Sequence, residues 1–315
     1  SFLKVYYFCR DRLRRKQETM DTFTLQGSIA ALVTPFNSDG TIDYTSYDAL
    51  LDFHLENGTS GVVVCGTTGE TPTLSEKEDA QMFEHTMKRI GGKMTVIAGT
   101  GSNSTASCIS YTKNAASSGV DAVLVVGPYY NKPTAEGMYL HFAELANNVN
   151  LPIILYNVPG RTGSAIKPAT VFRLANDFSN IVGIKEASGN IATIEELCDG
   201  RKKGFKVYSG DDSTSMVSNL LGADGCISVA CNVFPRDFAK MMELSIAGKA
   251  AEAREIHYKY RRLMELLFVE SNPIPVKAAL AAMGMMKEEY RLPLCRMADG
   301  NKSLLLAEMK RLGLV

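Results

Sequence analysis

The sequence predicts an α/β protein, a (β/α)8 TIM barrel followed by a small C-terminal helical appendix. From Ser28 onward, eight short β-branched runs alternate with longer amphipathic stretches. The runs are almost continuously hydrophobic, which is typical of parallel strands covered on both faces. Eight strand-helix units in about 230 residues match the size of such a barrel. A doubly wound sheet also alternates strands and helices, but it rarely needs eight such even units.

The predicted elements follow one another evenly along the chain. The strands begin at Ser28, Gly61, Met94, Asp121, Pro152, Ile181, Phe205 and Gly225. The helical stretches between them include residues 44–56, 76–89, 105–117, 136–148 and 191–199, and several open with residues that start helices. After Asn232 only helical periodicity appears, interrupted at Asn272 to Pro275. We therefore assign residues 20–248 to the barrel and 249–315 to a C-terminal helical region.

The first nineteen residues differ from the rest of the chain. Their apolar residues precede a basic cluster, which is the reverse of a secretory signal. Met20 directly precedes a more ordinary start. We interpret residues 1–19 as an expression remnant or a wrongly assigned upstream extension, in preference to a targeting arm.

The composition narrows the class of partner and the compartment. With 45% hydrophobic and 22% charged residues, the 315-residue chain can bury a large core. Lys+Arg equals Asp+Glu at 34 each, so no global charge favours nucleic acid or an anionic membrane. The seven cysteines are odd in number and form no C-x-x-C pair, which indicates reduced thiols in a cytoplasmic protein. The four scattered histidines give no metal-site spacing.

Lys185 is the first candidate site residue, because it ends the predicted strand that begins at Ile181 and active sites of these barrels lie at the carboxyl ends of the strands. A free lysine has a pKa of about 10.4, so a nucleophilic lysine needs surroundings that disfavour its ammonium form. Side chains alternate along a strand, so Lys185 is expected in the barrel lumen and Glu186 against the helix layer. The alternative is a structural lysine that extends out of the barrel mouth or pairs with Asp211. On the lysine alone, both interpretations are open.

Residues at neighbouring strand ends favour the nucleophile. Tyr156 offers a phenol that can carry a proton to and from a carbinolamine. Thr67 and Thr68, on a glycine-flanked turn, offer hydroxyls and backbone N–H groups suited to a small carboxylate. A lysine, a phenol and an anion cradle together predict a Schiff-base site for a 2-oxo acid.

Other motifs carry less weight. The stretch GTGSNS from Gly99 lacks the third glycine of a dinucleotide loop. Asp211 and Asp212 have no third acidic residue nearby, so a helix cap is favoured over a divalent-ion site.

Six motifs in order, GTTGE, PYYNKP, LYNVPGRTG, GIKEASGN, YSGDD and NPIPVK, resemble those of the dihydrodipicolinate synthases (4-hydroxy-tetrahydrodipicolinate synthases) of lysine biosynthesis. The resemblance runs from about Thr24 to the C-terminus. It implies a class I aldolase that condenses pyruvate with L-aspartate-4-semialdehyde to 4-hydroxy-tetrahydrodipicolinate, without metal or cofactor.

The resemblance also implies roles for individual catalytic residues. Lys185 would form the Schiff base with pyruvate, and Tyr156 would transfer protons. Thr68 would link Tyr156 to Tyr130 in a proton relay. In the family the residue matching Tyr130 comes from the neighbouring subunit, which implies a homodimer as the catalytic unit, usually paired into a homotetramer.

Further residues match the family's substrate contacts. Thr67 and the Thr68 backbone would hold the pyruvate carboxylate, and Arg161 would bind the carboxylate of the semialdehyde. Gly210 and Ile227 would line the site near Lys185.

The resemblance extends to an allosteric pocket for lysine at the dimer interface. Asn103 and Tyr129 match that pocket. Ser107 stands where lysine-sensitive members have a glutamate, and Asp79 stands at a histidine position. Because a serine offers only a neutral hydrogen bond, we expect weak or absent feedback by lysine.

Two alternatives remain open. N-acetylneuraminate lyase, or another pyruvate-dependent aldolase, would use the same lysine and tyrosine on a different second substrate. A barrel that binds small acids without catalysis is the non-enzymatic alternative.

Overall fold

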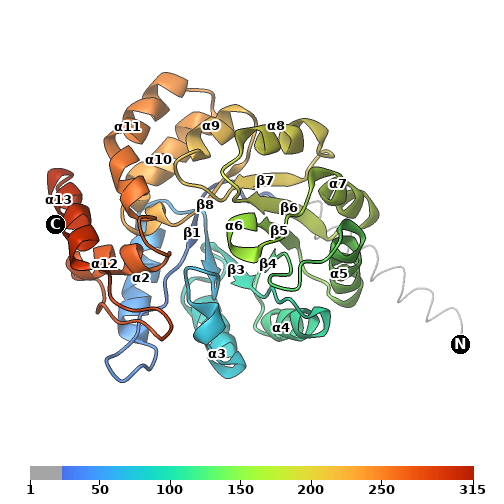
Figure 1. Ribbon diagram of the computed structural model, residues 1–315, viewed down its shortest axis with the longest axis horizontal. Helices are drawn as coiled ribbons and strands as arrows, with labels where there is room; N and C mark the ends of the chain where they lie inside the picture. The colour runs from blue at the N-terminus through green and yellow to red at the C-terminus, as the bar shows by residue number, and fades with distance from the viewer. Residues whose placement is uncertain (1–22) are drawn as a thin grey trace, which may run out of the picture.

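A computed structural model describes residues 23–315, so the interpretation of residues 1–19 lies outside the described part of the chain. Eight parallel strands close into a barrel in sequence order, with β1 hydrogen-bonded to both β2 and β8. Helices surround the barrel, as Figure 1 shows. The predicted (β/α)8 fold is therefore confirmed.

The strands are short and lie close to their predicted positions. They are β1 (Gly27–Ala31), β2 (Gly61–Val64), β3 (Thr95–Gly99), β4 (Ala122–Val126), β5 (Ile153–Asn157), β6 (Ile181–Glu186), β7 (Lys206–Ser209) and β8 (Gly225–Ser228). Several start one residue away from the prediction. Asp121 precedes β4 and accepts a hydrogen bond from Val96 N through its side chain, and Pro152 has no backbone N–H to donate.

The helices follow the strands. The α-helices are α2 (Tyr44–Glu56), α3 (Glu76–Ile90), α4 (Thr105–Ser117), α5 (Ala135–Asn148), α6 (Pro159–Thr162), α7 (Pro168–Asp177), α8 (Ile191–Gly200), α9 (Ser215–Leu220), α10 (Pro235–Ile246), α11 (Ala250–Leu266), α12 (Ile274–Ala282) and α13 (Asp299–Arg311). Two 3-10 turns are η1 (Thr71–Thr73) and η2 (Ala230–Asn232). Between residues 23 and 315, no helix combines the length and the apolar character that crossing a membrane requires.

Alternate residues of each strand belong to two separate cores. One set fills the lumen, with Ile29, Val63, Ile97, Ile154 and Ile227 among its buried members. The intervening residues pack against the helices in a larger outer core. The strands are apolar on both faces because each face meets a different core, and this explains the continuous hydrophobic runs.

The C-terminal helices cover one side of the barrel. Figure 1 shows α12 and α13 at the left of the view, and α13 packs against α11 and α12. The predicted boundary at residues 248 and 249 falls in the turn between α10 and α11. Leu263 of α11 and Leu305 of α13 nevertheless belong to the same core as the outer face of the barrel. The division into a barrel and a separate helical region therefore remains a prediction.

Candidate active site

Lys185 and Tyr156 meet at the carboxyl ends of β6 and β5. They occupy paired positions in the register of the two strands. The Lys185 amine lies 4.5 Å from the centre of the Tyr156 ring. Both side chains are buried, with 5% and 7% of their surfaces exposed. The structure thus brings together the two residues predicted for imine chemistry.

The alternative Lys185–Asp211 pair does not form. Asp211 Oδ1 instead accepts hydrogen bonds from Ser213 Oγ at 2.6 Å and Thr214 N at 2.9 Å, capping the turn before α9. Within residues 23–315, the Lys185 amine has no carboxylate within salt-bridge distance. The lysines that do form ion pairs are others, for example Lys206, Lys277 and Lys302. Lys185 therefore forms no ion pair within this part of the chain.

Glu186 lies on the opposite face of β6, as the alternation of strand side chains predicts. Its Oε2 accepts a hydrogen bond of 2.7 Å from Asn157 Nδ2, away from the lumen. Lys185 and Glu186, adjacent in the chain, therefore do not pair.

Gly210 provides the surface along which the Lys185 side chain lies. A Cβ at this position would stand 2.8 Å from Lys185 Cε and 2.5 Å from the Cβ of Ala187. No side chain fits in that space. Ile227 is fully buried in the lumen core. Gly210 thus lies against Lys185, and Ile227 belongs to the lumen core.

The loop after β2 carries Thr67 and Thr68 and is called the threonine loop below. Thr68 is buried, and its Oγ1 accepts a hydrogen bond of 2.9 Å from Asn272 Nδ2. Glu70 follows in the left-handed region at φ 58° and pairs with Lys277 of α12. The loop is therefore held from the C-terminal region.

Asn272 and Lys277 received no role from the sequence. Both lie in the NPIPVK stretch, for which the sequence predicts no role beyond the family resemblance. The sequence does contain a signal for the Lys277 contact. A lysine within the apolar stretch IPVKAALAA predicts a buried charge, and a buried charge needs a partner.

The predicted relay, in which Thr68 links Tyr156 to Tyr130, is not assembled within the described part of one chain. The hydroxyl of Thr68 contacts Asn272, and the Tyr130 side chain is 88% exposed. Tyr130 also has a positive φ of 71°, an uncommon conformation for a tyrosine. The loop holds this residue outward, away from its own barrel.

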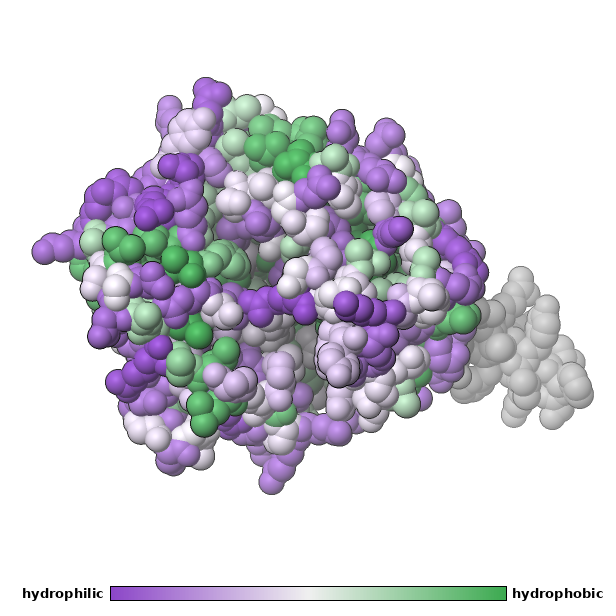
Figure 2. Space-filling model, in the orientation of Figure 1, coloured by the Kyte–Doolittle hydropathy of each residue, from purple (hydrophilic) through white to green (hydrophobic). Residues whose placement is uncertain are grey.

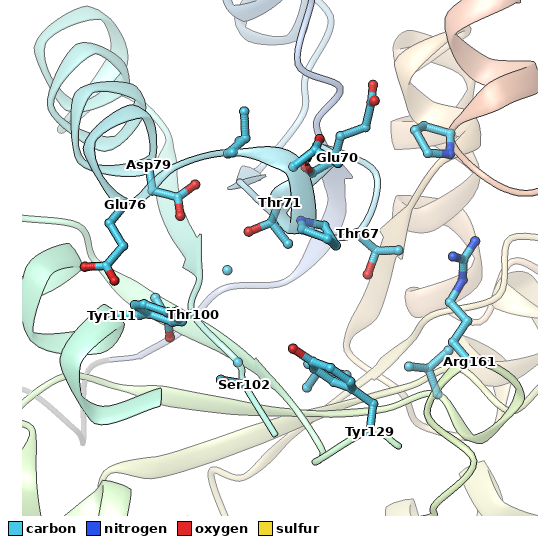
Figure 3. Close-up of a pocket in the computed structure, with 18 of the residues that line it drawn as sticks. Thr67, Glu70, Thr71, Glu76, Asp79, Thr100, Ser102, Tyr111, Tyr129 and Arg161 are labelled. Atoms are coloured by element: carbon cyan, nitrogen blue, oxygen red, sulfur yellow. Dashed lines mark hydrogen bonds between the residues drawn. The ribbon is translucent and has the colours of Figure 1, made fainter. Parts of the chain in front are cut away.

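A cavity of about 560 Å³ lies beside the mouth of the barrel. The face seen in Figure 2 is hollowed near its centre. Thr67 and Arg161 bound one side of the cavity and Asp79 the other, with Tyr129 between them, as Figure 3 shows. Lys185 and Tyr156 are not part of the cavity wall, so the cavity leads toward the threonine loop rather than onto the amine itself.

Arg161 stands at the rim of the cavity on α6. Its side chain donates a hydrogen bond of 3.0 Å from Nη2 to the backbone oxygen of Asn272. Asn272 therefore contacts both Thr68, which is predicted to bind pyruvate, and Arg161, which is predicted to bind the semialdehyde.

Comparison with known proteins agrees with this geometry. Residues 24–312 match the Dihydrodipicolinate synthetase family. The chain belongs to this family. A 4-hydroxy-tetrahydrodipicolinate synthase of Chlorobium limicola is 47% identical over 296 residues, covering 94% of this chain and 100% of the relative. The chain is an enzyme of the lyase class.

Solved structures of the family share the fold. The dihydrodipicolinate synthase of Aquifex aeolicus has a TM-score of 0.90 at 45% identity, covering 92% of this chain and 98% of that one. The chloride-inhibited enzyme of Acinetobacter baumannii, in complex with pyruvate, has a TM-score of 0.91 at 44% identity and covers 93% and 100%. All the predicted site residues of this chain lie within the matched span.

The residues expected in an allosteric pocket are only partly gathered. Tyr129 and Asp79 line the cavity, whereas Asn103 and Ser107 do not. Asn103 Nδ2 instead donates a hydrogen bond of 3.1 Å to the Tyr129 backbone oxygen. Burial raises the pKa of the Asp79 carboxyl to about 6, a shift that the neighbouring Glu78 and Glu76 increase. Its Oδ1 is buried and accepts no hydrogen bond from residues 23–315.

Among the same residues, no three His, Cys, Asp or Glu side chains gather closely enough to hold a metal ion. The cysteines of this part of the chain, for example Cys65 and Cys226, are all free thiols.

Proposed function

We propose that this enzyme is a class I aldolase that condenses pyruvate with L-aspartate-4-semialdehyde to 4-hydroxy-tetrahydrodipicolinate, in lysine (diaminopimelate) biosynthesis. The observation that carries the proposal is the buried Lys185 amine, which faces Tyr156 and has no carboxylate partner in the described chain. The catalytic unit is a homodimer, paired into a homotetramer, and the enzyme works in the cytoplasm. Neither nucleic acid nor a membrane is among its partners.

In this mechanism the Lys185 amine attacks the C2 carbonyl of pyruvate and forms a carbinolamine. Loss of water gives an imine, and Tyr156 is the phenol that moves the protons of both steps. Loss of a proton from C3 makes an enamine, which forms the new carbon–carbon bond with the semialdehyde carbonyl. Attack of the substrate's own amine on the imine then closes the ring and releases Lys185.

The remaining predicted residues bind a substrate or shape the site. Thr67 and the Thr68 backbone bind the pyruvate carboxylate, and Arg161 binds the carboxylate of the semialdehyde. Gly210 leaves room for the Lys185 side chain, and Ile227 closes the floor of the site.

Reduction of the imine tests this function directly. Borohydride added with pyruvate is expected to leave one reduced pyruvyl group on Lys185, located by peptide mass spectrometry, because only an imine is reduced in this way. No labelling would favour a barrel that merely binds small acids. Labelling together with cleavage of N-acetylneuraminate, and no use of the semialdehyde, would identify the sugar-acid lyase activity instead.

Arg161→Ala is expected to raise the KM for the semialdehyde roughly tenfold to a hundredfold, because a charge-assisted contact is worth about 1.5–3 kcal/mol. The KM for pyruvate should change much less. Steady-state kinetics with each substrate varied in turn measure both values. Arg161→Lys is the matched variant, since it keeps the charge and loses the bidentate fork. Equal changes for both substrates would mean that Arg161 serves a different ligand.

A relay shared between subunits predicts complementation. Mixing an inactive Tyr130→Phe chain with an inactive Lys185→Ala chain should restore part of the activity once the chains have exchanged, because one mixed site inherits both intact residues. The outward position of Tyr130 supports this expectation. Activity is measured on heterodimers isolated by two affinity tags. Isolated heterodimers without activity would place Tyr130 in its own subunit's site or outside catalysis.

Lysine is expected to inhibit the enzyme weakly or not at all, because Ser107 offers no negative charge to the effector's amine. Any residual inhibition that uses Asp79 should strengthen as the pH rises through about 6, because the carboxyl is then ionised. Inhibition curves at pH 5.5 and 8 measure this, with Asp79→Asn as the comparison. Sub-millimolar inhibition that is lost on changing Tyr129 or Asn103 would contradict the prediction.

A further inference from the structure

A second residue pair lies directly behind the proposed reacting pair. Tyr156 and Lys185 are partners in the register of β5 and β6, and the next partners along are Asn157 and Glu186. Because side chains alternate, the first pair faces the lumen and the second faces away from it. Asn157 and Glu186 are 4% and 2% exposed. One strand pair thus carries the proposed chemistry on one face and a buried polar pair on the other.

Each side-chain nitrogen and oxygen of this outer pair takes part in a hydrogen bond. Asn157 Nδ2 donates to Glu186 Oε2 at 2.7 Å. Asn157 Oδ1 accepts from Ile166 N at 2.9 Å, and Glu186 Oε1 accepts from Ser188 N at 2.7 Å. The bonds run from the loop after β5 to the loop after β6. Since the amide donates on one side and accepts on the other, its orientation is fixed.

Burying this polar pair costs more free energy than burying apolar side chains would. A buried carboxylate is destabilising unless its oxygens are hydrogen-bonded, and Glu186 has only these uncharged N–H donors as partners within residues 23–315. Aliphatic side chains of similar size would fill the same volume without that penalty. The same bonds hold the carboxylate away from the neighbouring Lys185. These features indicate a role beyond packing.

The register of β5 and β6 is irregular near one end. Near the amino end of the two strands the pairing shifts by one residue, because Ile153 pairs with Ile181 while Ile154 pairs with Gly183. A similar slip at the carboxyl end would turn Lys185 out of the lumen, since strand side chains have a period of two. The Asn157–Glu186 bond crosses the strands at that end. It forms in the register that sets Tyr156 against Lys185.

We infer that Asn157 and Glu186 are positioning residues, whose hydrogen bond on the outer face of the barrel fixes the register in which Lys185 meets Tyr156 on the inner face. The inference rests on the proposed role of Lys185 as the imine-forming amine. Neither residue touches the reacting atoms.

Exchanging the two groups tests the inference. In the double variant Asn157→Asp with Glu186→Gln, the carboxylate moves to β5 and the amide to β6. The carboxylate accepts from Ile166 N and from the new amide, and the new amide oxygen accepts from Ser188 N, so every bond of the network is kept with the central one reversed. Each single change breaks it. Asn157→Asp places two carboxylates side by side with no hydrogen-bond donor between them. Glu186→Gln forces an amide N–H to face a second donor, either Asn157 Nδ2 or Ser188 N.

The main readout is the rate of borohydride trapping of pyruvate on Lys185, normalised to folded protein. Each single variant should trap about tenfold more slowly or worse, because a buried hydrogen bond to a charged group is lost. The double variant should return to within about threefold of the parent chain. Trapping at the parent rate in both single variants, or a double variant no better than the poorer single one, would overturn the inference.

Asn180→Asp is the matched control. Asn180 is also buried, and it stands at the amino end of β6, where its Nδ2 donates to the backbone oxygens of Ala146 and Val149. The same substitution there should lower stability without slowing trapping per folded molecule. If the single variants do not fold, the double variant alone decides, since the inference requires it to fold and trap near the parent rate.

Failure of the proposed function gives a different result. A parent chain that is not labelled at Lys185 would refute the Schiff-base function itself. The register is then read without substrate, from hydrogen exchange of the Ala187 and Gly210 amides, which donate to the backbone oxygens of Asn157 and Glu186. Protection lost in the single variants and restored in the double variant supports the positioning role. Unchanged protection throughout overturns it.

Discussion

Lys185→Ala is expected to abolish borohydride-trappable pyruvate and to lower kcat by at least about a thousandfold, as removal of the nucleophile does in covalent catalysis. The reason is chemical, because the proposed imine forms on the Lys185 nitrogen and alanine has no amine to replace it. Lys185→Arg should not restore activity, since a guanidinium stays protonated and cannot attack a carbonyl. Peptide mass spectrometry after reduction and steady-state kinetics measure the two effects.

Lys206→Ala is the control for this prediction. Lys206 stands on β7, next to β6, but its amine pairs with Asp224 at 2.9 Å. It should keep both the label at Lys185 and most of the activity of the parent chain. A label that persists in Lys185→Ala, or that appears on another lysine of the parent chain, would remove Lys185 from the mechanism.

Lys277→Ala is expected to have the largest effect on stability, a loss of about 3–5 kcal/mol. The Lys277 side chain is fully buried and pairs with the equally buried Glu70, so its removal leaves an uncompensated charge in the core. Burial lowers the pKa of the Lys277 ammonium, and the nearby Glu70 opposes that shift. The fall in Tm should be roughly 5–15 °C. Thermal and denaturant unfolding measure it.

Removing both charges distinguishes an ion pair from simple packing. In Lys277→Met with Glu70→Gln, no charge is left buried, and the amide oxygen can still accept from Arg291 N, which lies 3.3 Å from Glu70 Oε2. Most of the lost stability should return. Because Glu70 directly follows the loop that carries Thr67 and Thr68, we expect Lys277→Ala also to slow the trapping of pyruvate, and the double variant to restore it. A double variant as unstable as Lys277→Ala would mean that the pair contributes through packing and not through charge.

Much of the fold could be read from the chain because it depends on local periodicity. Continuous β-branched runs predicted strands buried on both faces, and the run ending at Lys185 became β6 at the predicted place. The alternation of side chains along a strand was enough to predict that Lys185 faces the lumen and Glu186 faces away from it. Helix starts were found where a side chain caps the backbone, as Ser75 does for α3.

The site was less complete, because its supporting contacts join residues far apart in sequence. Asn272 reaches Thr68 across 204 positions, and Lys277 reaches Glu70 across 207. Nothing in the local pattern of either segment specifies the other. The exposed position of Tyr130 also has no local signal, since it results from the path of one loop.

The sequence by itself determined the barrel, the strand that carries Lys185 and the face on which its amine lies, because the period of a strand is a property of consecutive residues. Only the tertiary structure decided how far the amine stands from Tyr156, that Glu186 is held by Asn157, and that the cavity opens over Thr67 and Arg161. Those features arise when the strands close in one register and the C-terminal helices pack on the mouth. Closure and packing depend on the whole chain at once, whereas periodicity depends on neighbouring residues alone.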